Sequence, residues 1–169
     1  DIYSNFYVTT DLPTDEDPTN DTLFKSIVAL PTYQLPYFND FESLNDLWLI
    51  TGINASWEQT APSGVVISNA YSGDRVWMTD NLSSYNDNDS SYVEFPCFNL
   101  NNSYYPIMEL QIWYYSEENV DGARLEYSID NGNTWEIVDT TGENLGFDWY
   151  NSDNISALES QGWGQNTGD

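Results

Sequence analysis

The side chains from Ser128 to Trp135 have the types and the spacing for a definite piece of local chemistry. They follow the pattern S-x-D-x-G-x-T-W, known as an Asp box. The Ser128 hydroxyl and the Asp130 carboxylate can accept hydrogen bonds from the turn amides, and Gly132 can take the positive φ of a tight turn. We expect Trp135 to fold back over the turn as an apolar lid. The pattern predicts a self-contained β-hairpin and does not by itself indicate catalysis.

Short runs of β character extend on both sides of this motif. Turn residues separate them, and short strands at this spacing favour a β-sandwich or a jelly roll. In one run, Leu110 and Ile112 alternate with Gln111 and Trp113, which predicts a central strand with two apolar faces. The predicted strands are residues 48–51, 56–59, 64–69, 75–79, 91–95, 107–115, 123–129 and 134–138.

The two ends of the chain have a different character. Residues 2–10 and 22–30 alternate around an acidic, proline-containing loop, so we predict a hairpin that is marginal alone. The prolines between residues 31 and 36 indicate a boundary, with 1–35 on one side and 36–169 on the other. Near the other end we predict one short helical turn at 154–160, within a long ordered loop at 142–169.

The charge balance restricts the partners. The chain of 169 residues has 28 acidic residues against three lysines and arginines, for a formal net charge of −25. Such a surface repels phosphate backbones and anionic membranes, so we expect no nucleic-acid binding. No apolar run is long enough for membrane insertion. The acidity suits either a solvated surface in salty surroundings or a set of calcium sites, and both interpretations stay open.

Two residue types used in catalysis are scarce or absent. The chain has no His, which removes the usual general base and the Ser–His and Cys–His nucleophile systems. The lone Cys97 cannot form an intrachain disulfide, and its apolar surroundings predict a buried, small hydrophobic side chain. No feature selects two of the 28 acidic residues as a glycosidase pair. We therefore expect that the protein is not an enzyme.

Several segments together resemble the MAM-like and reelin-like jelly-roll modules of bacteria. The opening resembles P-Y-x-x-D-F-E, a later segment S-G-x-x-x-W, and the next Y-x-N-N-E-x-S-Y-V-x-S-P-C-F. The region that contains the Asp box resembles W-Y-x-x-E-x-x-x-D-G-x-x-x-x-Y-S-x-D-G-G-x-T-W. In chain order the similar segments are residues 36–42, 54–58, 71–77, 85–98 and 113–135.

This resemblance implies a fold and a setting. Such modules occur in large secreted and cell-surface proteins of gliding bacteria, are often exported by the type IX route, and serve adhesion or accompany secreted hydrolases. Residues 1–35 resemble the last hairpin of a preceding immunoglobulin-like domain, so 36–169 would be an all-β jelly-roll β-sandwich. The family pattern continues past the match at Trp163, which implies that the final strands are missing. Further domains or another chain would complete the sandwich.

Calcium is the cofactor that this resemblance and the acidity imply. Calcium takes about six to eight oxygen ligands, which carboxylates supply. The resemblance points to Asp40, Glu42 and Asp74, and Asp121 before Gly122 is a further candidate. The alternative interpretation is that these are solvated carboxylates at strand ends. The oxygen-rich loop 80–89 is a second candidate, although it lacks EF-hand spacing.

Exposed aromatic side chains are the second candidate feature. Trp and Tyr can stack on sugar rings, and the candidate glycan-binding residues near loops are Tyr105, Trp149 and Trp163. Most tryptophans in a jelly roll belong to the core, where we expect Trp48, Trp57, Trp77 and Trp113.

The sequence thus predicts a non-catalytic, calcium-stabilised adhesion or recognition module of a large bacterial surface protein. Its partners would be glycans or surface proteins. The alternatives are a carbohydrate-binding accessory domain of a secreted hydrolase or peptidase, and a structural stalk that itself binds nothing.

Overall fold

The computed structural model describes residues 3–10, 14, 16–44, 47–138 and 147–164, and these residues are all-β apart from one short 3-10 helix, η1 (Pro18–Asn20). The chain divides into two compact units, Asp1–Met108 and Glu109–Asp169, which we describe separately. The strands of the described residues pair two by two. None of these residues form a helix long and apolar enough to cross a membrane.

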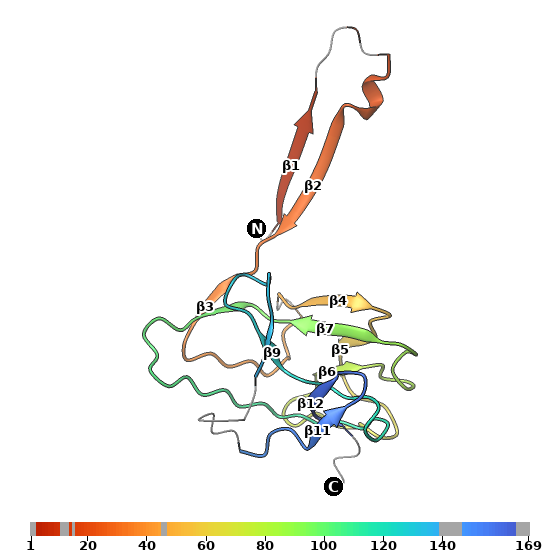
Figure 1. Ribbon diagram of the computed structural model, residues 1–169, viewed down its shortest axis with the longest axis vertical. Helices are drawn as coiled ribbons and strands as arrows, with labels where there is room; N and C mark the ends of the chain where they lie inside the picture. Colours follow the sequence, from red (N-terminus) through yellow and green to blue (C-terminus); the bar gives the residue numbers. More distant parts are fainter. Residues whose placement is uncertain (1–2, 11–13, 15, 45–46, 139–146, 165–169) are drawn as a thin grey trace. The chain divides into compact units, whose positions relative to one another are not determined.

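The predicted N-terminal hairpin is confirmed. β1 (Tyr3–Thr9) pairs antiparallel with β2 (Thr22–Val28), as Figure 1 shows. Tyr7 lies opposite Phe24, and their ring centroids are 5.0 Å apart. Both side chains are more than half exposed, with exposed fractions of 68% and 53%. Two strands alone cannot cover their own apolar faces. The origin of this hairpin in an immunoglobulin-like domain stays a prediction.

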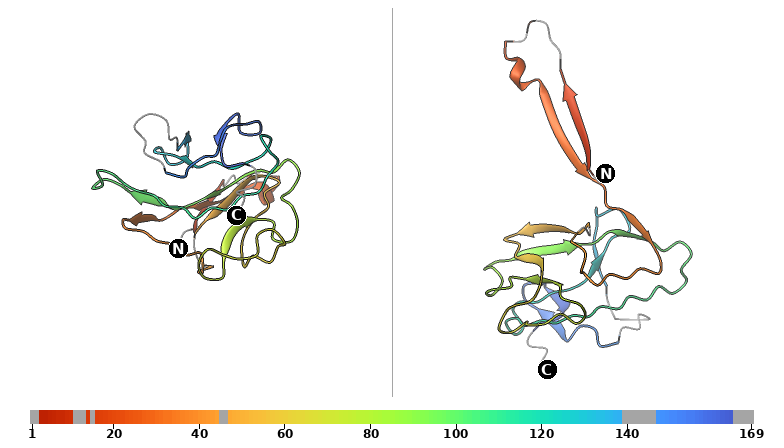
Figure 2. Two further views of the ribbon diagram at one scale, coloured as in Figure 1. Left: turned by 90° about the horizontal axis from the view of Figure 1, so that it is seen from below. Right: turned by 180° about the vertical axis from the view of Figure 1, so that it is seen from behind.

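Four further predicted strands form two antiparallel pairs. β4 (Leu49–Ile53) pairs with β7 (Ser90–Glu94), and β5 (Trp57–Thr60) pairs with β6 (Val76–Thr79). Strand β5 also contacts β7, so the two pairs lie next to one another (Figures 1 and 2). The prediction of a strand at 64–69 is wrong: this segment bends at 64–66, and Val65 is fully exposed.

One pair of strands was not predicted. β3 (Thr32–Gln34) runs parallel to β8 (Cys97–Asn99), with Tyr33 opposite Phe98. Residues 32–34, which lie at the predicted boundary, are therefore strand. Cys97 is exposed, so the prediction of burial is wrong. Successive side chains of a strand point to opposite faces, and in β8 Phe98 takes the face that contacts other aromatic rings.

The interior of the first unit is a continuous series of aromatic contacts. At its centre Trp48 lies 4.8 Å from Phe95 and 5.1 Å from Phe41, measured between ring centroids. Among the described residues of this unit, Met78 is the buried hydrophobic side chain, with 6% exposed. Trp48, Trp57 and Trp77 are half-buried, so the prediction that they lie in the core is met only in part. The rings of the series are Tyr33, Tyr37, Phe98, Phe95, Trp48, Phe41 and Trp77.

The second unit contains two hairpins. β9 (Glu126–Tyr127) pairs with β10 (Glu136–Ile137), and β11 (Ser152–Ile155) pairs with β12 (Ser160–Gly162). An isolated bridge joins Ala123 to Trp163. The predicted helical turn at 154–160 is wrong, because these residues form the end of β11, a turn and the start of β12. The long-loop prediction fails for the same reason over 147–164, while 139–146 and 165–169 lie outside the described residues.

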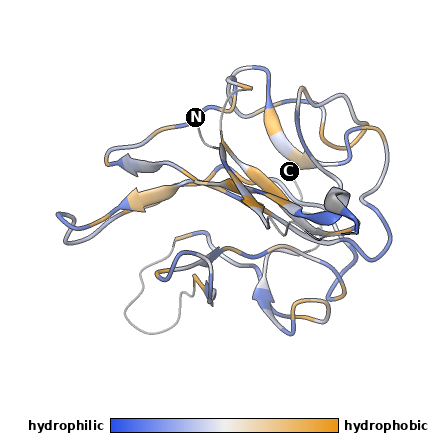
Figure 3. Cartoon of the chain, turned by 90° about the horizontal axis from the view of Figure 1, so that it is seen from above, coloured by the Kyte–Doolittle hydropathy of each residue, from blue (hydrophilic) through white to orange (hydrophobic). Residues whose placement is uncertain are grey.

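Burial in the second unit centres on Ile155 and Trp163, with exposed fractions of 0% and 4%. The predicted strand at 107–115 forms no sheet, and Trp113 is 41% exposed rather than in the core. Apolar stretches lie on connecting segments as well as on strands (Figure 3). The described residues therefore leave much apolar surface open, and such surface marks sites where ligands or partners bind.

Candidate functional site

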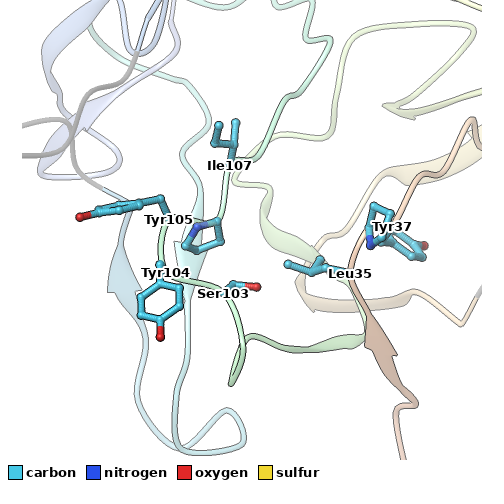
Figure 4. Close-up of a pocket in the computed structure, with 8 residues that line it drawn as sticks. Leu35, Tyr37, Ser103, Tyr104, Tyr105 and Ile107 are labelled. Carbon is cyan, nitrogen blue, oxygen red and sulfur yellow. The ribbon is translucent and has the colours of Figure 1, made fainter.

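The first unit contains an open groove, which we call the tyrosine groove. It lies between residues 35–37 and 103–107 and has a volume of about 460 Å³, within the range of ligand sites. The side chains of Leu35 and Ser103 lie between the two segments, whereas the rings of Tyr104 and Tyr105 project from the second segment and point away from residues 35–37 (Figure 4).

Local hydrogen bonds shape both walls. On one wall, Asn39 donates its side-chain amide to the Tyr37 hydroxyl at 2.9 Å, and the Tyr37 ring contacts Phe98 at 5.0 Å. On the other, the Ser103 amide donates to the carbonyl of Leu100 at 2.9 Å. The Leu35–Pro36 peptide bond is cis. The aromatic core therefore holds Tyr37 in place, and a turn presents the tyrosines that follow Ser103.

The chemistry of the groove is uncharged and aromatic. None of the residues that line it is acidic or basic, although the chain carries a net charge of −25. Tyr104 is 94% exposed and Tyr105 is 91% exposed. An exposed tyrosine offers a planar apolar face and a polar hydroxyl, which suits a sugar ring or an uncharged peptide segment. Tyr105 is thus the sequence-predicted ligand residue that the structure places at an open site.

Trp149 and Trp163, the other two residues predicted to bind glycans, have a different role. The rings of Trp149, Tyr150 and Trp163 contact one another, with Trp163 at 5.1 Å from Trp149 and 4.7 Å from Tyr150. Trp149 is half-buried and donates its indole N–H to the carbonyl of Val138 at 3.2 Å. Trp163 has no exposed ring face to offer, which corrects our expectation. Its neighbours Gly162 and Gly164 gave the sequence a loop character that concealed the core position.

The structure places the Glu42 carboxylate next to the main chain of Asp74, and hydrogen bonds explain this contact. One Glu42 carboxylate oxygen accepts the amide protons of Asp74 at 2.8 Å and of Arg75 at 2.9 Å. Asp40 in turn accepts the amide proton of Glu42 at 3.2 Å. Gly73 has a φ of 62°, and a side chain there would collide with the Glu42 carboxylate. The carboxylate therefore closes the turn at Gly73.

Within the part of the chain that the structure describes, no group of three or more acidic, His or Cys side chains is arranged to hold a metal ion. Asp121 belongs to the second unit, where its main-chain carbonyl accepts the Ser116 hydroxyl proton at 2.8 Å. Calcium binding by Asp40, Glu42, Asp74 and Asp121 is therefore a proposal with its own test.

The oxygen-rich loop 80–89 uses its carboxylates for local hydrogen bonds. The Ser83 hydroxyl and the amides of Leu82 and Ser83 donate to Asp80, which lowers the pKa of that carboxyl. Asp89 accepts the amide and hydroxyl protons of Ser56 at 3.0 and 2.5 Å. The Asp80 contacts are typical of a turn-forming aspartate, whereas Asp89 connects the loop to Ser56, a residue 33 positions earlier in the chain.

The Asp box folds as predicted. Gly132 has a φ of 81° and donates its amide to Ser128 Oγ at 2.8 Å. The hydroxyl and the amide of Thr134 donate to Asp130 at 2.7 and 2.8 Å. With the Ser128 hydroxyl, these donors lower the pKa of Asp130 to about 2. Trp135 is 45% exposed, and its packing over the turn stays a prediction.

Comparisons with known proteins give no assignment: no family model, no curated protein and no solved structure matches this chain.

Proposed function

We propose that this chain is a non-catalytic recognition module of an adhesin-type surface protein. The observation that carries the proposal is the tyrosine groove, an uncharged aromatic surface on a strongly acidic chain. The net negative charge of the chain repels anions, while an uncharged lining costs little to desolvate for a neutral ligand. Neutral glycans and uncharged segments of surface proteins have the chemistry that this groove fits.

The described aspartates with lowered pKa values have structural contacts within their own turns. Catalytic acids and bases have perturbed pKa values in a cleft. The aspartates with lowered pKa values are Asp17, Asp80 and Asp130, each through hydrogen bonds to its own turn. None of them lines the tyrosine groove. Their role is to close turns.

A carbohydrate-binding accessory domain of a secreted hydrolase or peptidase is the second candidate. The exposed rings of Tyr104 and Tyr105 favour it, because consecutive aromatic side chains near a groove can stack on the apolar faces of pyranose units. Both candidates use the same groove. They differ in what stands beside this module in its parent protein.

The jelly-roll arrangement belongs to the proposal as well. Its support is the all-β character and the two neighbouring antiparallel pairs β4–β7 and β5–β6. Open edges on such pairs normally receive further strands. A crystal structure in which these pairs join one continuous sandwich would establish the arrangement.

The functional test is binding to an array of neutral polysaccharides, followed by affinity electrophoresis on each hit. Tyr105→Ala and Tyr104→Ala should weaken binding by about tenfold or more, because each removes a stacking face. Tyr71→Ala is the matched control, since Tyr71 is 78% exposed and lies outside the groove. Equal losses in all three variants, or binding to anionic polymers in preference to neutral ones, would contradict the proposal.

A further inference from the structure

The segment 109–115 has the geometry of a strand although it belongs to no sheet. The chain runs without a turn or a bend from residue 106 to residue 117. Gln111 donates its side-chain amide to Glu109 at 3.1 Å, and the rings of Trp113 and Tyr115 lie 6.3 Å apart at 22°. Contacts between residues two apart on one side are the signature of an extended chain, whose repeat is about 6.7 Å.

The main chain of this segment is unpaired. None of the main-chain hydrogen bonds among the described residues involves residues 107–115, and no strand is paired with them. Its N–H and C=O groups therefore have no main-chain partner among the described residues. A row of such groups in an extended segment is a template for another strand.

The segment also exposes large apolar side chains, which a neighbouring strand could cover. Ile112 is 42% exposed and Trp113 is 41% exposed, and they point to opposite faces. Leu110 and Tyr115 are similarly open at 37% and 57%. β-Branched and aromatic residues of this kind prefer a pleated surface between neighbouring strands. A strand placed alongside would satisfy the main chain and cover apolar side chains on both faces.

We propose that residues 109–115 are the acceptor for β-strand addition by an extended segment of another polypeptide. The occupant has apolar residues at alternate positions and lysine or arginine between them. The positive charge follows from the net charge of −25 and from Glu109, the one charged residue of the segment. The same net charge opposes a second copy of this chain as the occupant, because both copies repel each other. This inference is independent of the tyrosine groove.

Hydrogen–deuterium exchange of the intact chain tests the proposal. The probe is a short synthetic peptide in which valine alternates with lysine and threonine. Without the probe, amides 109–115 should exchange rapidly at every chain concentration. A saturating amount of the probe should slow their exchange by about tenfold or more. The same peptide with methylated backbone nitrogens should have no effect, since it cannot donate ladder hydrogen bonds.

Two variants make the test specific. Ile112→Pro removes one amide donor and disfavours the ladder, so the probe should bind about tenfold more weakly or worse. Val65→Pro is the matched control, because Val65 is exposed in a segment without regular structure, and it should leave the affinity unchanged.

Three results would overturn the inference. The first is slow exchange at 109–115 in the free, dilute chain, which means that these amides already have partners. The second is slow exchange that develops as chain concentration rises, which assigns the segment to a second copy. The third is exchange that the saturating probe leaves unchanged, or equal affinity of the methylated peptide.

Discussion

The indole rings of Trp48 and Trp77 lie nearly parallel, with centroids 5.8 Å apart and an angle of 17° between their planes. The Nε1–H groups of both rings are buried and have no hydrogen-bond partner among the described residues. A buried donor without a partner costs about 1–3 kcal/mol. The packing of this stacked pair therefore stabilises the fold, while its two buried N–H groups without partners destabilise it.

Trp77→Phe should change the free energy of unfolding by no more than about 1 kcal/mol. The smaller ring loses apolar contact, but the substitution also removes the unsatisfied donor, and the two effects offset one another. Urea unfolding followed by circular dichroism measures the change.

Met78→Ala is the comparison for this variant, because Met78 is 6% exposed and has no such compensation. It should cost about 2–5 kcal/mol. If Trp77→Phe destabilises the chain as much as Met78→Ala does, then the indole N–H has a partner such as a bound water, and the interpretation is wrong.

Glu42 allows the structural and the calcium roles of the acidic loop to be separated. Glu42→Ala removes the acceptor of the Asp74 and Arg75 amides, and should lower the free energy of unfolding by about 1–3 kcal/mol in chelator. Glu42→Gln keeps an oxygen acceptor, so it should be nearly neutral in chelator. If Glu42 is also a calcium ligand, Glu42→Gln should reduce the rise in melting temperature that calcium causes.

The measurement is a pair of thermal melts, in calcium and in chelator, at fixed ionic strength. Glu16→Gln controls for the change in net charge, since Glu16 is exposed and lies in the N-terminal hairpin region. A calcium-dependent shift that is the same in the wild type, Glu42→Gln and Glu16→Gln would remove Glu42 from the ligand set. The absence of any shift in the wild type would refute the calcium proposal.

The strands that sequence predicted correctly are those that local patterns define. Residues 2–10 and 22–30 alternate, and the segments that became β4, β5, β6 and β7 are short runs of β character between turn residues. The Asp box succeeded for the same reason, because Ser128, Asp130 and Gly132 make contacts within a few residues of one another. Local hydrogen bonds and alternation depend on residues that are close in the sequence, so a sequence pattern predicts them.

The failures depend on contacts between distant residues. The parallel pair of Thr32–Gln34 with Cys97–Asn99 joins segments with no shared local signal. The segment 107–115 has the composition of a central strand, yet composition cannot supply the neighbours that a sheet needs. At the candidate site, sequence singled out Tyr105 correctly as exposed but not Leu35 or Tyr37, which the fold brings to the opposite wall.

Acid should remove the contribution of the Asp box to the stability of the fold, because its central carboxylate becomes protonated. The pKa of Asp130 is lowered from 3.8 to about 2 by the donors of Thr134 and Ser128. A carboxyl whose pKa is depressed by folding stabilises the folded state above its unfolded pKa, and that stabilisation is lost as pH falls through the folded pKa. The contribution of Asp130 should therefore be complete above about pH 4 and disappear by about pH 2.

Thermal melts of the wild type and Asp130→Asn between pH 7 and pH 2 measure this contribution. The wild type should be more stable near neutral pH, and the difference should shrink as the pH falls below about 4. Asp153→Asn removes the same charge from the same unit and controls for net charge. A difference between the wild type and Asp130→Asn that stays constant down to pH 2 would contradict this role.

Close packing around Ile155 predicts a defined cost for a single added methyl group. A Cβ on Gly122 would lie 2.5 Å from Cδ1 of Ile155 and 2.5 Å from the carbonyl oxygen of Trp163. Gly122→Ala should therefore destabilise the second unit by about 1–3 kcal/mol. Urea unfolding that monitors this unit through the fluorescence of Trp149 and Trp163 measures the change.

Ile155→Val tests whether the clash is the reason, because valine lacks the Cδ1 atom that the new methyl group would meet. In the Ile155→Val background, Gly122→Ala should cost less than in the wild type by about 0.5–1 kcal/mol. The relief is partial, since the Trp163 carbonyl oxygen belongs to the main chain and cannot be trimmed away. Strictly additive effects would mean that Gly122→Ala acts through the main chain alone, and that the contact with Ile155 does not determine the cost.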